Sequence, residues 1–78
     1  MDPNETILTL IDHVYMGNVD EAQEFAEYLV SWLSRDGFEP DDEHKSDLLV
    51  MCLQYDGQLK SWNDCVNLLA QRKLYFVN

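Results

Sequence analysis

The chain has 78 residues, of which 46% are hydrophobic and 12% aromatic, and fifteen acidic residues stand against five basic ones. We expect a single domain over residues 1–78, because this hydrophobic share suffices for a small core and exceeds that of disordered chains. The net charge of −10 argues against direct binding to nucleic acid or anionic lipid and favours basic protein surfaces as partners.

The acidic residues are unevenly distributed along the chain. Residues 1–47 hold thirteen acids and two bases, a net charge of −11, whereas residues 48–78 hold two acids and three bases, a net charge of +1. No run of about 18 apolar residues is present that could cross a membrane. The opening MDPNETILTLID lacks the basic segment of a signal peptide. We therefore expect a cytoplasmic protein that does not enter a membrane.

The first predicted helix begins at Asp2 and Pro3, where an N-cap residue precedes proline at the first helical position. Apolar residues then recur every three or four positions, which is typical of one buried helix face. Gly17 and Asn18 are expected to end this helix. Its predicted inward face consists of Ile7, Leu10, Ile11 and Val14.

The second predicted helix starts near Asn18 or Asp20 and is the clearest amphipathic segment of the chain. Acidic residues near its N-terminus suit the helix dipole. We expect it to end at Asp36 and Gly37, with Gly37 in the left-handed conformation of a C-cap glycine. Its predicted inward face consists of Ala22, Phe25, Ala26, Leu29, Val30 and Leu33, with Trp32 at the edge.

Two further helices follow the turn FEPDDEHKSD. The third is expected to end at Asp56 and Gly57, and the fourth to run from near Ser61 to Gln71–Lys73. The remaining LYFVN is a short apolar C-terminal tail, for which folding back on the bundle is favoured over serving as a contact surface. The predicted fold is thus all-α, a compact bundle of three to four short helices. The predicted inward residues are Leu48, Leu49, Cys52 and Tyr55, with Met51 and Leu53 beside them, then Trp62, Cys65, Val66 and Leu69.

The two cysteines, Cys52 and Cys65, are too few and too far apart in sequence for a zinc framework. Both lie among apolar residues at helical spacing, so buried free thiols are expected. A disulfide is the alternative, which a reducing cytosol disfavours.

Residues 36–47 have the length of an EF-hand calcium loop, but their composition excludes one. The third and fifth positions are Phe38 and Pro40, the glycine is second instead of sixth, and the last residue is Asp47. His44 has acidic neighbours, yet no second imidazole lies nearby, so a solvated histidine is favoured over a metal ligand. No metal or cofactor is expected.

Nothing in the spacing of the cysteines and histidines places a base beside a nucleophile. The chain also lacks a glycine-rich phosphate loop and a GxSxG motif. We predict that the protein is not an enzyme.

A stripe of acidic residues follows the second predicted helix. Asp20, Glu24 and Glu27 have the spacing i, i+4 and i+7, which places carboxylates about 5–6 Å apart, comparable to phosphates along one nucleic-acid strand. Surfaces that serve only solubility usually mix both signs of charge. The predicted partner-binding face consists of Asp20, Glu21, Glu24, Glu27, Glu39, Asp41, Asp42 and Glu43.

The segment YLVSWLSRDGFEP, residues 28–40, resembles a segment of small uncharacterised proteins encoded in bacteriophage genomes, in which an acidic helix ends in a WLSRGGFLP-like sequence. The opening MDPNETI also resembles theirs, so the similarity covers residues 1–40. It implies a phage accessory protein acting on host machinery and names no activity. The matching residues are Trp32, Leu33, Ser34, Arg35, Gly37, Phe38 and Pro40, whereas Asp36 and Glu39 differ.

Two hypotheses follow for function. The first is an inhibitor or modulator that imitates phosphate charge and binds a basic, nucleic-acid-binding host protein in the host-cell cytoplasm, in the manner of anti-CRISPR and other anti-defence proteins. The second is a homodimer or adaptor module that uses apolar contacts, since aromatic residues concentrate binding energy. Its candidate residues are Trp32, Trp62, Leu74, Tyr75 and Phe76.

Overall fold

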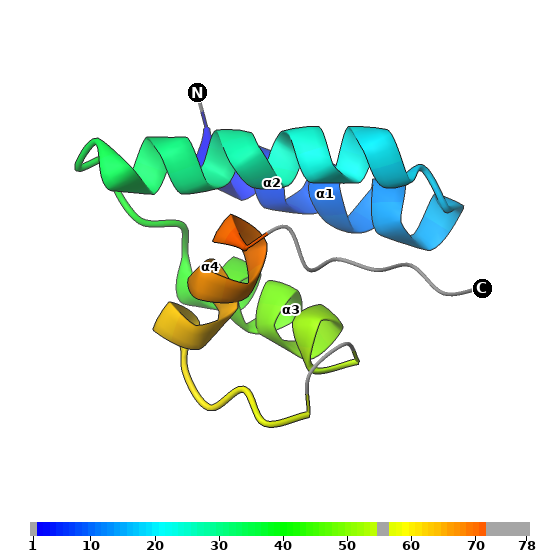
Figure 1. Ribbon diagram of the computed structural model, residues 1–78. Helices are drawn as coiled ribbons and strands as arrows, with labels where there is room; N and C mark the ends of the chain where they lie inside the picture. The colour runs from blue at the N-terminus through cyan, green and yellow to red at the C-terminus, as the bar shows by residue number, and fades with distance from the viewer. Residues whose placement is uncertain (1, 55–56, 72–78) are drawn as a thin grey trace.

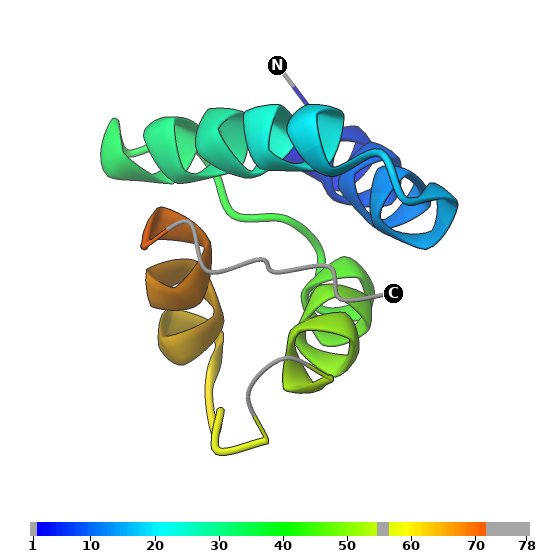
Figure 2. The same ribbon diagram turned by 45° about the vertical axis from the view of Figure 1, so that its right-hand side comes forward.

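The computed structural model describes residues 2–54 and 57–71, and this part of the chain contains four α-helices and no strand (Figure 1). Figures 1 and 2 show α1 and α2 side by side as one layer, with α3 and α4 forming a second layer against it. The predicted all-α bundle is therefore confirmed. The helices span Pro3–Met16 (α1), Val19–Ser34 (α2), Asp42–Leu53 (α3) and Trp62–Ala70 (α4).

Helix α1 begins as the sequence predicts. The Asp2 carboxylate accepts a hydrogen bond of 2.9 Å from the backbone N–H of Asn4, and Pro3 occupies the first helical position. Proline is tolerated there because its missing N–H would have no partner within the helix. The side-chain oxygen of Asn4 also accepts a hydrogen bond of 2.8 Å from the backbone N–H of Asp41. This contact holds the start of α3 beside the start of α1.

Gly17 reverses the chain between α1 and α2. Its φ of 77° lies in the left-handed region, and the N–H groups of Gly17 and Asn18 donate to the carbonyls of Val14 and His13 at 3.1 and 2.9 Å. These two hydrogen bonds form the Schellman motif, which favours glycine because no Cβ opposes the left-handed backbone. Helix α2 therefore begins after a turn of two residues and runs back along α1 (Figure 1).

The end of α2 differs from its prediction. Asp36 is the residue with left-handed backbone, at φ 59°, and Gly37 is not among the residues with positive φ, so the expected left-handed Gly37 is wrong. The N–H of Gly37 donates to the carbonyl of Trp32 at 3.0 Å. Glycine is required at position 37 by the indole beside it, because a Cβ there would lie 2.3 Å from Cε2 of Trp32.

All four helices supply side chains to one buried apolar core. The predicted inward faces of α1 and α2 are confirmed, since each residue named for them is buried or packs partly buried against the core. In α3, Met51 is buried whereas Leu53 is 37% exposed, and in α4 Leu68 is buried whereas Val66 is only partly so. Helix α4 contacts both α2 and α3, which widens its buried arc to include Leu68. The core residues are Ile7, Leu10, Ala22, Ala26, Leu29, Leu48, Met51, Cys52, Cys65, Leu68 and Leu69.

Helix α4 begins next to Ser61, as predicted, and Ser61 is its N-cap, since its hydroxyl accepts a hydrogen bond of 3.3 Å from the backbone N–H of Asp64. The Asp64 carboxylate in turn accepts a 2.9 Å hydrogen bond from the backbone N–H of Lys60, so two donors at the start of the helix are satisfied. The predicted roles of Tyr55, Asp56 and residues 72–78, including the tail LYFVN, lie outside the described residues. No helix in the described part combines the length and apolar character needed to cross a membrane.

Candidate functional site

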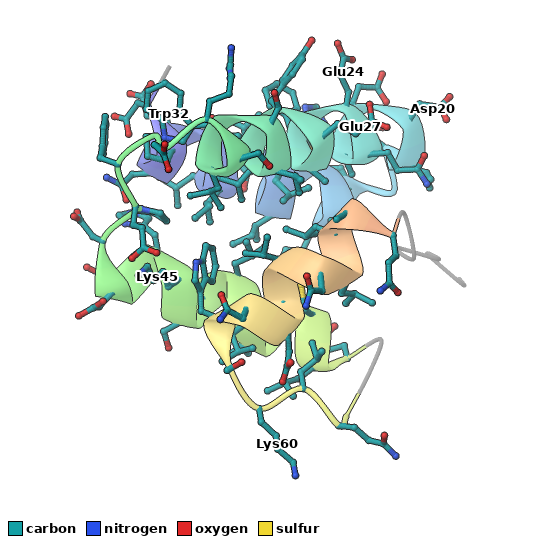
Figure 3. The ribbon with its side chains drawn as sticks, turned by 60° about the vertical axis from the view of Figure 1, so that its left-hand side comes forward. Asp20, Glu24, Glu27, Trp32, Lys45 and Lys60 are labelled. Atoms are coloured by element: carbon teal, nitrogen blue, oxygen red, sulfur yellow. The ribbon has the colours of Figure 1, made fainter. Side chains whose placement is uncertain are left out.

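Four of the predicted contact residues, which we call the α2 acidic group, lie on one exposed surface. Asp20, Glu24 and Glu27 fall within an arc of about 60° around the axis of α2, because 3.6 residues complete one helical turn. In Figure 3 Asp20, Glu24 and Glu27 gather over the N-terminal half of α2. No lysine or arginine occurs within α2 itself. The group consists of Asp20, Glu21, Glu24 and Glu27, all exposed.

An aromatic side chain that the sequence analysis missed borders the α2 acidic group. Tyr28 is 47% exposed, and its hydroxyl donates a hydrogen bond to the Glu24 carboxylate. This hydrogen bond, together with the negative charge of Glu24, raises the pKa of Tyr28 above its ordinary value. The signal in the sequence is the i, i+4 spacing of Glu24 and Tyr28, which places the two side chains on the same helix face.

Two further rings hold Tyr28 in place. Phe25 meets the Tyr28 ring edge-on at a centroid distance of 5.7 Å, and His13 of α1 stacks on Phe25 at 5.4 Å. The side-chain amide of Asn18 lies 3.2 Å from Nδ1 of His13, within hydrogen-bonding distance. This row of contacts connects the exposed phenol to the α1–α2 turn, so the surface combines carboxylates with a supported aromatic ring.

The other four predicted acidic residues, the α3 acidic group, lie at the opposite end of α2. They occupy the turn before α3 and the first turn of α3, and all are exposed. Asp20 lies fourteen residues before the end of α2 at Ser34, which is about 21 Å along the helix axis, so the α3 acidic group lies far from the N-terminal end of the α2 acidic group. This group consists of Glu39, Asp41, Asp42 and Glu43.

The cations of the described residues lie away from the α2 acidic group. Nζ of Lys45 is 2.6 Å from the Glu39 carboxylate and 5.6 Å from the centroid of the Trp62 ring. Figure 3 shows Lys45 and Lys60 on the side of α3 and α4, remote from Asp20 and Glu24. Nε of Arg35 donates to the backbone carbonyl of Ser31 at 3.3 Å. Among the described cations, Lys45 thus offsets the negative charge of Glu39, which belongs to the α3 acidic group.

The two tryptophans of the alternative apolar surface are engaged within the fold. The indole N–H of Trp32 donates to the carbonyl of Phe38 at 2.9 Å, and the two rings meet edge-on at 5.4 Å. Trp62 packs against the core and lies under Lys45. The remaining candidates, Leu74, Tyr75 and Phe76, lie outside the described residues.

An open cavity of about 450 Å³ lies between the C-terminal half of α2 and α4. Its apolar lining comes from Val30, Leu33, Trp62 and Val66, and Asp36 and Glu39 also line it. Ser34 also lines the cavity, and its hydroxyl donates a hydrogen bond of 2.8 Å to the backbone carbonyl of Val30. None of the described lining residues is a histidine or a cysteine.

The described residues offer no cluster of three or more histidine, cysteine or acidic side chains that could hold a metal ion. Helix α3 begins at Asp42, so half of the segment 36–47 is helical and does not have the backbone of a calcium loop. His44 is partly buried, and its Nδ1 has no hydrogen-bond partner among residues 2–54 and 57–71.

The exposed carboxylates on the outer face of α2 could bind a partner of opposite charge. The phenol of Tyr28 lies at the edge of this face. The similarity of residues 28–40 to phage proteins stays a prediction. Comparison of the chain with protein-family models, with curated proteins and with solved structures finds no match.

Proposed function

We propose that the protein is a non-enzymatic binding protein whose α2 acidic group docks on a basic surface of a protein partner. The observation that carries this proposal is the outer face of α2, where four exposed carboxylates lie within about two helical turns and the helix contributes no basic residue. A basic surface would gain from this arrangement in both rate and specificity of association, since opposite potentials steer two proteins together.

The arrangement has a cost to folding that supports a role in binding. Glu24 has acidic residues at positions i−4, i−3 and i+3, namely Asp20, Glu21 and Glu27. Like charges at these separations each destabilise a helix by about 0.2–0.5 kcal/mol. A surface that served only solubility would mix charges of both signs. Tyr28 adds the kind of aromatic contact that is frequent in protein interfaces.

The class of partner that we propose is a nucleic-acid-binding protein. Its basic surface normally receives a row of phosphates, and the exposed carboxylates of α2 present a row of negative charges in their place. The similarity to phage proteins suggests a setting for this activity, in which the partner is a host protein, for example a CRISPR or other defence component in the host-cell cytoplasm.

A charge-reversal experiment tests the proposal. The Glu24→Lys/Glu27→Lys variant and the wild type are used to capture partners from a host lysate at about 50 and 500 mM salt, where screening differs strongly. The matched control is Asp42→Lys/Glu43→Lys, which changes the net charge equally but lies in the α3 acidic group.

We expect a basic partner whose affinity falls at high salt and falls at least about tenfold further in the α2 variant than in the control. Duplex nucleic acid should compete for the same partner. Circular dichroism confirms that each variant is folded. A complex that resists salt, or an equal loss in the two variants, would contradict the proposal.

The alternative, a homodimer or adaptor using apolar contacts, has weaker support, because Trp32 uses its indole N–H and ring inside the fold. Light scattering of the full chain and of a chain lacking residues 74–78 separates the two ideas. A dimer that this deletion dissociates supports the alternative, and a monomer in both cases removes it.

A further inference from the structure

The core contains a pair of thiols that the proposed function does not use. Cys52 of α3 and Cys65 of α4 are both fully buried and both free, and their sulfur atoms lie 3.3 Å apart. The two residues are thirteen positions apart in the sequence. Their proximity therefore comes from the packing of α4 against α3.

We infer that Cys52 and Cys65 are a disulfide-forming pair, and that an oxidant of the peroxide class converts them into a covalent tie between α3 and α4. A disulfide requires the sulfur atoms to move from 3.3 Å to about 2.05 Å. That is a small displacement for two side chains that already face each other. No third cysteine exists in the chain, so the intramolecular product is unique.

The hydrogen bond between the thiols assigns their roles. The S–H of Cys65 donates to the sulfur of Cys52. This hydrogen bond lowers the pKa of Cys52, although burial opposes the effect, whereas the same hydrogen bond and burial raise the pKa of Cys65. The thiolate is the reactive form of cysteine, so the hydrogen bond in this orientation favours Cys52 as the sulfur that attacks and Cys65 as the sulfur that resolves.

The reaction has two steps. The Cys52 thiolate attacks one oxygen of hydrogen peroxide, the O–O bond breaks, and the products after protonation are a sulfenic acid and one water. The Cys65 sulfur then attacks the Cys52 sulfur, the S–O bond breaks, and the hydroxyl leaves as a second water with the Cys65 proton. Two thiols and one peroxide thus give one disulfide and two waters, with two electrons passing from sulfur to oxygen.

Access to the pair depends on local opening of the bundle. Both sulfur-bearing residues have no exposed surface, so an oxidant reaches them only when α4 separates transiently from α3. Peroxide is small enough to exploit such an opening. Oxidation should therefore be slower than for an exposed thiol, and faster under conditions that loosen the bundle without unfolding it.

The folded structure should favour the disulfide over the unfolded chain. In the structure the sulfurs are held together, whereas the unfolded chain must close the loop from residue 52 to residue 65 at an entropic cost. By thermodynamic linkage, the oxidised protein should also resist unfolding more than the reduced protein.

The experiment uses the full chain without any substitution. After peroxide treatment, mass spectrometry should show a monomer that has lost two hydrogen atoms and resists alkylation after denaturation. Equilibration with dithiothreitol redox buffers, in native buffer and in denaturant, gives the ratio of disulfide to dithiol in each state. We expect the native ratio to be higher by at least about tenfold.

The single variants Cys52→Ser and Cys65→Ser serve as controls, since neither can form the intramolecular bond. Two results would overturn the inference. One is a wild type whose thiols both remain open to alkylation, or whose oxidation yields only linked dimers or sulfinic acid. The other is a native ratio equal to or below that of the unfolded chain.

Discussion

At the scale of single residues, the corner after α2 shows how one position can be fixed by its neighbour's side chain. A Cβ on Gly37 would lie 2.3 Å from Cε2 of the Trp32 ring. The indole N–H of the same ring donates to the backbone carbonyl of Phe38. Asp36 takes the left-handed conformation, which aspartate tolerates better than most residues. The glycine is therefore needed for space and not for its backbone freedom.

We expect Gly37→Ala to destabilise the protein by about 1–3 kcal/mol, the usual cost of inserting a group into a packed site. The new methyl group must displace Trp32 and weaken its hydrogen bond to Phe38. Urea denaturation followed by tryptophan fluorescence measures the effect.

The matched control is Gly57→Ala, since no described atom lies within 4 Å of a Cβ placed at Gly57. This variant should stay within about 0.5 kcal/mol of the wild type. Equal losses in the two variants would mean that the indole does not constrain position 37.

At the scale of the elements, two aspartates occupy the same N-cap position and differ in what they bind. Asp2 accepts the N–H of Asn4 at the start of α1, whereas Asp41 at the start of α3 makes no side-chain capping hydrogen bond. We expect Asp2→Ala to cost about 1 kcal/mol, typical of a lost N-cap. Asp41→Ala should cost less than half of that, although both variants lose one acidic charge. Thermal unfolding by circular dichroism compares the two, and equal shifts would show that charge matters more than the capping bond.

The helices were largely predictable because their signals are local. The caps at Asp2 and Ser61 and the glycine at position 17 act within a few residues, and the apolar spacing depends on helix geometry alone. The burial of Leu68 was not predictable, because it follows from the contact of α4 with both α2 and α3. The approach of Cys52 to Cys65 has the same origin in tertiary packing.

At the scale of the whole molecule, the eight acidic residues predicted to contact a partner form two groups, although the sequence suggested one surface. Glu39 follows Arg35 closely along the chain, but the length of α2 separates it from Asp20. The turn is then directed to the start of α1 by the hydrogen bond between Asp41 and Asn4, residues 37 positions apart. Local patterns contain no information on such a contact, so exposure of the acids was predictable and their grouping was not.

The uneven charge predicts a conflict between stability and binding. We expect Glu24→Gln to raise the melting temperature by about 2–4 °C at low salt, because it removes repulsion from three acidic neighbours while its amide oxygen can still accept from Tyr28. The gain should fade above about 0.5 M salt, where charges are screened.

The control for that change is Asp12→Asn, an exposed acid of α1 with no acidic residue three or four positions away. Asp12→Asn also removes one negative charge, but it removes no repulsion between neighbouring acids of a helix. Its melting temperature should therefore stay near that of the wild type. If α2 is a binding surface, Glu24→Gln should bind the partner more weakly while melting later, and Asp12→Asn should change neither property. A stabilised Glu24→Gln that binds as tightly as the wild type would separate the acidic stripe from partner recognition. The cost of these charges to folding would then need another cause.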